Sequence, residues 1–288
     1  MKYAIGFITL LLVLSGCKSN VKNSDAHSGA TWISDKIHYP QEKHLKNIKQ
    51  LTFGGDNAEA YWSFDGKSIV FQSNNKAWGL ACDQIFTMDL KEDLSKGAKP
   101  QMISTGLGRT TCSYFMPGDA TIVYSSTHLA GTDCPPAPKK EDHGGKYIWP
   151  VYGSFDVFIA DKKGNQIKQL TDSPGYDAEP TVSPKGDKIV FTSVRNGDLD
   201  LYTMNIDGSE VKQVTFELGY DGGAFFSPHA TKLIFRSSRP KTPAATTATT
   251  PTQQTRSTAR TSSAPTARSA FPTSFFSSSR FRRSSCRS

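Results

Sequence analysis

The fold is decided by the stretch IKQLTDSPGYDAEPTVSPKGDKIVFTSVRNGDLDLYTMNIDG, residues 167–208. It starts with an apolar residue and a threonine, continues through a polar loop and a Ser-Pro turn, and then alternates between apolar and polar residues. The same order of features returns in residues 211–238 and 48–73, and in a diverged form in residues 100–126. A unit repeated in this way indicates a fold built from similar structural elements packed side by side.

Each complete repeat has the pattern of four short strands. In the third repeat we predict them at residues 178–183, 188–193, 200–205 and 210–215. Side chains alternate with the period of two that strands require, and Asp207-Gly208 is a strong signal for a tight hairpin. Four antiparallel strands in a unit of this length form one blade of a β-propeller.

Three departures from the repeat are informative. The fourth repeat supplies only two strands, at residues 223–227 and 232–237, and then its pattern stops. Residues 47–52 have the pattern of a fourth, outer strand that precedes the first repeat, so we expect them to complete a closing blade. Residues 129–153 are rich in Pro and Gly and predict a long loop inside the second repeat.

The segments SPKGDKIVFTS, residues 183–193, and LYTMNIDG, residues 201–208, resemble the TolB-type, WD-like propeller repeat. The resemblance covers about residues 45–239 and is weakest in the second repeat, where Met116-Pro117-Gly118-Asp119 replaces the Ser-Pro turn. It implies an all-β fold, a β-propeller of four-stranded antiparallel blades, of which about three and a half from an expected six are present. It also implies a protein that binds partners rather than one that catalyses.

The N-terminus has the features of an export signal. Lys2 precedes an apolar run that ends at Leu14, and Leu14-Ser15-Gly16-Cys17 resembles the bacterial lipobox. We therefore expect a signal peptide over residues 1–16, a lipid anchor on Cys17, and a tether over residues 17–45. No Asp follows the cysteine, so the resemblance favours the outer membrane of the bacterial cell envelope, facing the periplasm or the surface. The alternative is an ordinary secretory signal.

Residues 240–288 differ in composition from the propeller region, residues 46–239. They contain no Ile, Val, Leu, Gly, Asn, Asp or Glu, and they are expected to be disordered. The change falls inside a blade, which favours a frame shift near residues 242–245 over a natural low-complexity tail. The eight Lys and Arg residues of this stretch equal the whole net charge of +8, so residues 1–239 are neutral and we expect no binding to nucleic acid.

The cysteines of the propeller region are Cys82, Cys112 and Cys134. An exported chain permits disulfides, but three cysteines leave one unpaired and the sequence does not select the pair. Reduced, partly buried thiols are the alternative. Because C-x-x-C and H-x-x-x-H spacings are absent, we expect no zinc. The acids at residues 198, 200 and 207 could suggest calcium, and the His and Asp residues of the long loop another metal, but strand ends and a solvated loop explain them better. We therefore expect no metal and no cofactor.

No nucleophile elbow, zinc-binding H-E-x-x-H pair or P-loop is present, so we predict no catalytic residues. When the starts of the first strands are aligned, Asn57, Thr110, Asp177 and Asp221 are equivalent, and so are Glu59, Cys112, Glu179 and Gly223. First strands face the central channel of a propeller, so the candidates for partner binding lie there and on neighbouring loops. The acidic and amide side chains could instead cap loop amides. A propeller hydrolase or lyase with these acids as general acid and base, and a carbohydrate-binding propeller, remain alternatives. The candidates are Asn57, Glu59, Trp78, Arg109, Tyr176, Asp177, Glu179, Tyr220 and Asp221.

Overall fold

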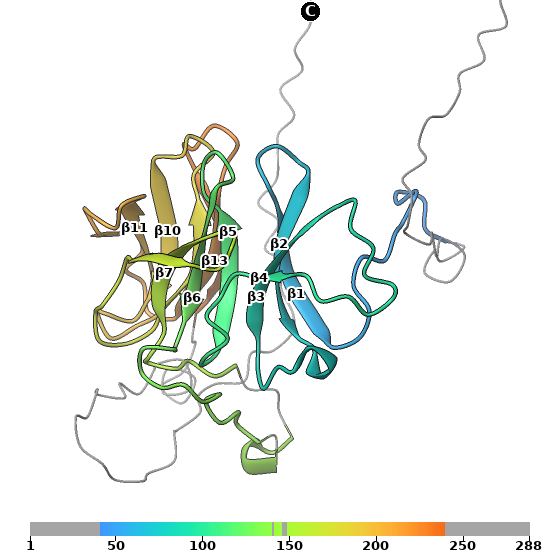
Figure 1. Ribbon diagram of the computed structural model, residues 1–288. Coiled ribbons are helices and arrows are strands. Elements are labelled where there is room, and N and C mark those ends of the chain that lie inside the picture. The colour runs from blue at the N-terminus through green and yellow to red at the C-terminus, as the bar shows by residue number, and fades with distance from the viewer. Residues whose placement is uncertain (1–40, 140, 146–148, 240–288) are drawn as a thin grey trace, which may run out of the picture.

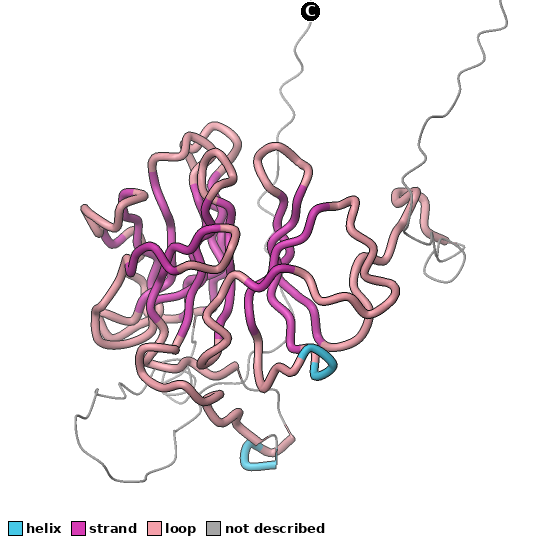
Figure 2. The backbone as a smooth tube through the Cα atoms, in the orientation of Figure 1, coloured by secondary structure: helices cyan, strands magenta, loops and turns pink. Residues whose placement is uncertain are grey.

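The computed structural model describes residues 41–139, 141–145 and 149–239. The predicted signal peptide, Cys17, most of the tether and the whole of residues 240–288 lie outside these residues. In the described part, antiparallel sheets stand one after another along the chain (Figure 1). Two short 3-10 helices, Lys76–Trp78 and Glu141–His143, are the only helical segments of this part (Figure 2).

Three sheets have four strands each and the last has two, and in each sheet the strands lie in chain order. The first sheet contains β1 (Asp56–Trp62), β2 (Ser68–Asn74), β3 (Gln84–Asp89) and β4 (Gln101–Met102). The second contains β5 (Thr110–Phe115), β6 (Thr121–Ser126), β7 (Asp156–Asp161) and β8 (Gln166–Gln169). The third contains β9 (Asp177–Val182), β10 (Lys188–Ser193), β11 (Asp200–Asn205) and β12 (Lys212–Gln213). The last contains β13 (Tyr220–Phe226) and β14 (Leu233–Ser238).

This arrangement confirms the predicted fold class: an all-β propeller with three complete blades and half of a fourth. The strands of the third blade agree with their predicted ranges to within a residue or two, except that the outer strand is only Lys212–Gln213. The loop between Ser126 and Asp156 contains no strand in its described part, as the Pro and Gly residues there predicted.

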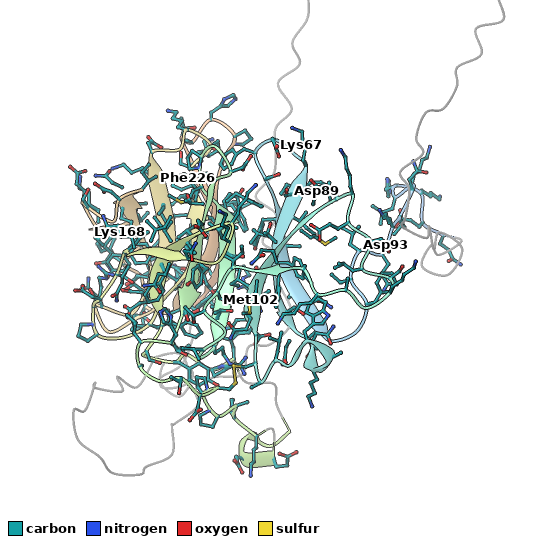
Figure 3. The ribbon with its side chains drawn as sticks, viewed as in Figure 1. Lys67, Asp89, Asp93, Met102, Lys168 and Phe226 are labelled. Atoms are coloured by element: carbon teal, nitrogen blue, oxygen red, sulfur yellow. A yellow bond between two sulfur atoms is a disulfide. The ribbon has the colours of Figure 1, made fainter. Side chains whose placement is uncertain are left out.

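The hydrophobic core lies between neighbouring blades, because each sheet buries apolar side chains on both faces (Figure 3). Ile85 and Phe115 belong to the core between the first and second blades, and Val123 and Phe191 to that between the second and third. The two-stranded last sheet packs on the third blade through Ala224, with Val190 and Leu201 beneath it. Blades therefore stabilise one another by burial, and a single blade has no closed core of its own.

A hydroxyl group two residues after the outermost strand of each complete blade links the end of that strand to the neighbouring strand. Thr171 Oγ1 accepts a hydrogen bond from the Val157 amide at 2.9 Å and donates one to the Asp156 carboxylate at 3.3 Å. The third blade repeats this geometry with Thr215, and the first blade with Ser104. The apolar-Thr pair that marks the repeat in sequence is thus a hydrogen-bonding site within each blade.

The turn of the second blade departs from the Ser-Pro pattern for a reason that the structure reveals. Asp119 has a φ of 59°, at the position where Gly66 and Gly186 have 68° and 71°. A left-handed conformation is strained for a residue other than glycine. The Asp119 carboxylate offsets the strain, because it accepts the amides of Phe64 and Asp65 in the preceding blade at 2.8 and 2.9 Å.

The prediction of a strand at residues 47–52 is wrong, since no strand forms there. The local geometry of an outer strand persists nonetheless: Gln50 Nε2 donates to the Thr52 carbonyl at 2.8 Å, as Gln169 does to Thr171 at 2.7 Å. The missing element is the neighbouring strand, because no third strand of a closing blade exists among the described residues. Leu51 and Phe53 instead pack against the outer face of the first blade.

We predict that Thr171→Val lowers the free energy of unfolding by about 1–3 kcal/mol, because it leaves the buried Val157 amide and the Asp156 carboxylate without this partner. Thr52→Val is the matched control, since none of the described amides binds its hydroxyl, and it should change stability by less than about 0.5 kcal/mol. Urea denaturation of both variants measures the difference. Equal effects of the two substitutions would contradict the structural role given to this hydroxyl.

Candidate functional site

Each innermost strand contains one extra residue with a left-handed backbone. These residues are Glu59, Cys112, Glu179 and Gly223, with φ values of 52°, 43°, 59° and 60°. At each of them the pairing with the second strand shifts register, which identifies a β-bulge. The shared conformation confirms that the four positions are equivalent, as the alignment of the repeats predicted. A strained non-glycine residue recurring at one place points to a functional constraint there.

The four bulges meet around one cavity of about 310 Å³ at the centre of the blades. The bulge residues supply two carboxylates and a thiol to its wall. Aromatic rings and one cation complete the lining, from Tyr61, Trp149, Phe225 and Arg236. The innermost strand β5 lies next to both β1 and β9, and the rings of Tyr61 in β1 and Phe225 in β13 lie 5.6 Å apart between their centroids. The cavity is therefore the central channel that the propeller fold predicts.

Glu179 is buried in the channel wall, with 6% of its surface exposed, and is held on all sides. Thr192 Oγ1 and the Gly223 amide each donate to its Oε2 at 2.7 Å. The Tyr220 hydroxyl lies 3.1 Å from both carboxylate oxygens, and Arg236 Nη2 is 3.9 Å from Oε1. These hydrogen bonds and the nearby guanidinium use the acceptor positions of the Glu179 carboxylate.

Glu59 stands at the equivalent position in the first blade but has different surroundings. It is half-buried and, among the described residues, receives a short hydrogen bond from one group, the hydroxyl of Tyr61. The ring of Tyr61 packs against Tyr114 and Phe225, with centroid distances of 5.3 and 5.6 Å. Glu59 therefore keeps acceptor capacity that is directed to the cavity, next to a fixed aromatic wall.

The cavity wall carries two carboxylates and one guanidinium, so its formal charge is negative. Burial raises the pKa of the Cys112 thiol well above its usual range, and the carboxylates of Glu179 and Glu59 raise it further. Burial also raises the pKa of Tyr61, together with its hydrogen bond to Glu59. Both groups are therefore neutral near pH 7, and Arg236 is the single cation that faces two carboxylates.

Two of the predicted site residues, Asp177 and Asp221, form ion pairs inside the protein. Asp177 is 1% exposed and pairs with Arg195 Nη2 at 3.0 Å. Burial raises the pKa of Asp177, while the charge of Arg195 opposes the change. Asp221 is fully buried and pairs with Arg239 Nη1 at 2.7 Å. Both carboxylates are therefore parts of ion pairs and do not line the cavity.

The remaining predicted residues also have internal contacts. The Asn57 side chain donates to the Gly54 carbonyl at 3.0 Å, which is a loop-capping contact. Trp78 packs on Phe86, with ring centroids 5.2 Å apart. Tyr176 is buried against Phe155. Of the predicted residues, only Glu59 and Glu179 line the cavity, and Tyr220 joins them through its bond to Glu179.

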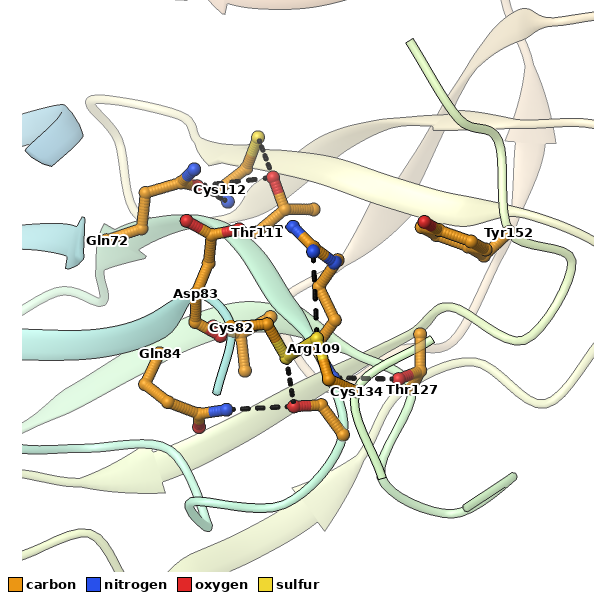
Figure 4. A network of polar contacts seen from close by, with 12 residues as sticks. Gln72, Cys82, Asp83, Gln84, Arg109, Thr111, Cys112, Thr127, Cys134 and Tyr152 are labelled. Atoms are coloured by element: carbon orange, nitrogen blue, oxygen red, sulfur yellow. Dashed lines mark hydrogen bonds and ion pairs between the residues drawn. A yellow bond between two sulfur atoms is a disulfide. The ribbon is translucent and has the colours of Figure 1, made fainter. Parts of the chain in front are cut away.

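Arg109 lies in a polar network that fastens the long loop (Figure 4). Its guanidinium pairs with Asp83, and both side chains are about four-fifths buried. Next to this pair the structure joins Cys82 to Cys134 by a disulfide, with the Cα atoms 5.8 Å apart, and leaves Cys112 free. The disulfide links the long loop, which also supplies Trp149 to the channel, to the first blade.

The cavity contains residues that the repeat alignment did not select. Tyr61 and Phe225 follow the bulge by two residues in their strands, so they face the channel for the same reason as the bulge residues. This spacing is a signal that could have found them. Arg236 pairs with Gly222 across the strand, directly beside a bulge. Trp149 comes from the long loop, and no periodic pattern places it in the channel.

Comparison with protein families gives one informative match. Residues 149–277 match the profile of the TolB beta propeller domain. The matched segment begins in the long loop, contains the third blade and the half-blade, and continues beyond the described residues. Over this segment the chain is similar to that domain, in agreement with the resemblance of its repeats. Comparison with curated proteins gives no match.

Solved structures with similar folds share little sequence with this chain. A TolB candidate from Agrobacterium tumefaciens is 21% identical, with 66% of this chain and 72% of that chain covered and a TM-score of 0.35. A chain of a nidogen/laminin complex is 13% identical, with coverages of 67% and 64% and a TM-score of 0.45. A puromycin-hydrolyzing peptidase from Mycobacterium tuberculosis is 12% identical, with coverages of 62% and 27% and a TM-score of 0.44. At these scores none of the three supports an argument about function.

We predict that replacing the disulfide by Cys82→Ser and Cys134→Ser together lowers the free energy of unfolding by up to about 4 kcal/mol, the chain-entropy value for its 52-residue separation. The double variant should also be cleaved faster by trypsin within residues 129–153. Thermal melting and limited proteolysis measure the two effects. Cys112→Ser is the control and should resemble the unmodified protein, whereas equal destabilisation by Cys112→Ser would contradict the assigned pairing.

Proposed function

We propose that this chain is a non-catalytic propeller protein of the bacterial cell envelope that binds a protein or peptide partner at the mouth of its channel. The observation that carries the proposal is the convergence of four β-bulges, three of them at strained non-glycine residues, on one cavity. Strain of about 1–3 kcal/mol per residue persists where a structure uses it, and loops around a rigid propeller are suited to recognition. The similarity to the TolB beta propeller domain agrees with a binding role.

The state of Glu179 supports binding over catalysis. A general acid or base must exchange a proton with a substrate, so it needs an accessible oxygen. Glu179 is buried and accepts bonds from Thr192, Tyr220 and the Gly223 amide. A hydrolase or lyase would need two channel acids that can exchange protons, and by this criterion only Glu59 of the two qualifies.

The disulfide supports the proposed location. Disulfides form and persist in oxidising compartments, such as the periplasm, and are rare in the bacterial cytosol. The Cys82–Cys134 pair therefore agrees with export by the N-terminal signal and with a lipid anchor on Cys17. Within the described residues no helix is long and apolar enough to cross a membrane. A frame shift near residues 242–245 stays part of the proposal, and the change in composition at that point supports it.

We predict that Cys112→Trp blocks partner capture, because Cys112 lines the cavity and an indole at this position fills it. Envelope proteins cross-linked to the unmodified chain and to the variant can be compared by mass spectrometry. Glu210→Gln is the control, since Glu210 is 57% exposed and its ion pairs among the described residues are with lysines at the surface. A partner lost with Cys112→Trp and kept with Glu210→Gln supports the site. Capture that is unchanged by Cys112→Trp, in a variant with an unchanged melting temperature, would refute it.

We also predict that Cys17→Ala moves the protein from the membrane fraction to the soluble periplasmic fraction. Removing the acylated residue removes the apolar chains that hold the protein at a bilayer. Detergent phase partitioning and intact mass, which should show the loss of the acyl groups, measure the change. An unmodified Cys17 in the mature protein would overturn the lipid-anchor proposal without affecting the channel site.

A further inference from the structure

We propose that the channel cavity binds the cationic end of an arginine or lysine side chain, with Glu59 as its counter-ion and Tyr61, Trp149 and Phe225 as its aromatic walls. This inference rests on the proposed function and states the chemistry that the partner must present. It concerns a basic segment of a protein or peptide, because the cavity offers negative charge and aromatic surface together.

The charge of the cavity favours a cation. Its wall holds two carboxylates and one guanidinium, so one negative charge is left over at neutral pH. The guanidinium of Arg236 is on the side of Glu179, at 3.9 Å, and bonds to the Tyr220 hydroxyl at 3.1 Å. Burial lowers the pKa of Arg236, whereas both carboxylates raise it, and Glu179 does so more strongly than Glu59. Glu59 is therefore the carboxylate whose charge is less fully balanced by Arg236.

The equivalent positions of the first and third blades explain why Glu59 is available. In the third blade the carboxylate of Glu179 accepts a hydrogen bond at 2.7 Å from the amide of Gly223, the bulge residue of the next blade. In the first blade the corresponding amide, that of Cys112, is bound instead by Gln72 Oε1 at 3.1 Å. Gln72 occupies the place of Thr192 in the third blade, since each pairs with the residue just before a bulge. Because Gln72 binds the amide of the next blade itself, Glu59 is not needed for the contact between blades that Glu179 makes.

The aromatic lining is the second argument. A cation near the faces of tryptophan or tyrosine is attracted by the ring electrons, and the attraction is stronger when water is excluded. A guanidinium is planar and weakly hydrated, so it tolerates such surroundings better than a small metal cation, which keeps its water. The contacts of Tyr61 with Tyr114 and Phe225 fix its ring before any ligand arrives.

The size of the cavity is the third argument. At about 310 Å³ it lies at the lower end of the range of about 300–1,000 Å³ for ligand pockets. A volume of this size accepts one long side chain and excludes a folded element. We therefore expect one anchoring cation from the partner inside the channel, with the rest of the partner on the surrounding loops.

The test uses two probes of nearly the same shape, N-acetyl-arginine amide and its neutral analogue N-acetyl-citrulline amide. Isothermal titration calorimetry of the full chain at low ionic strength should show at least tenfold tighter binding of the arginine probe. Glu59→Gln should weaken the arginine probe tenfold or more and abolish the preference over citrulline. Glu210→Gln, which removes the same charge from an exposed position, should leave both affinities unchanged.

A second variant keeps the test decisive if Glu59→Gln fails to fold. Arg236→Gln removes the cation of the cavity wall, whose side chain is 73% exposed. The variant should bind the arginine probe several-fold more tightly. Equal binding of the two probes, or affinities that neither variant changes, would overturn the cation site. If that happens while Cys112→Trp still abolishes partner capture, the proposed function stands and only the ligand chemistry fails. Glu59-dependent binding of arginine with capture unchanged by Cys112→Trp would instead leave the cation site standing and remove the partner role.

Discussion

The structure depends on a left-handed residue in each innermost strand. A regular strand would alternate its side chains between the two neighbouring blades, and none would be directed along the channel. The extra residue at the bulge changes the register and sets Glu59, Cys112 and Glu179 around one cavity. Such a conformation costs about 1–3 kcal/mol at each non-glycine position. Blade packing and hydrogen bonds between blades offset that cost, so the channel exists only because the blades are assembled.

Hydrogen bonds that repeat from blade to blade fix how the blades meet. The amides of Thr110, Asp177 and Asp221 each donate to a carbonyl of the preceding blade, at 3.0, 3.0 and 2.8 Å. Gly164 and Gly208 in the outer hairpins approach the preceding blade so closely that an added Cβ would lie 2.8 and 3.0 Å from a carbonyl oxygen. These contacts leave little freedom in the angle between blades. The geometry of the channel is therefore a property of the repeat and not of any single residue.

The sequence predicted what local pattern determines. Strand positions follow from alternation and turn residues, so the third blade was found nearly residue by residue, and the alignment of bulge positions was confirmed. It could not predict contacts that depend on distant partners. Asp177 and Arg109 looked like exposed anchors, and only the fold reveals their buried partners Arg195 and Asp83. The strand expected at residues 47–52 failed for the same reason, because a strand needs a neighbour that a local pattern cannot supply.

The difference between Glu59 and Glu179 explains why the proposed site has one available carboxylate although two blades supply an acid at the same position. Both residues occupy the same position with nearly the same backbone. In the third blade the short Thr192 donates to Glu179, and the carboxylate closes the contact with the next blade. In the first blade Gln72 closes that contact itself. The residue on the second strand, Gln72 or Thr192, therefore decides the role of the acid on the innermost strand. With Thr192 the carboxylate binds the next blade, and with Gln72 the carboxylate keeps free acceptor capacity in the channel. By this argument Gln72→Thr should draw Glu59 toward the Cys112 amide, and the charge that favours a cation in the channel would then be used for packing.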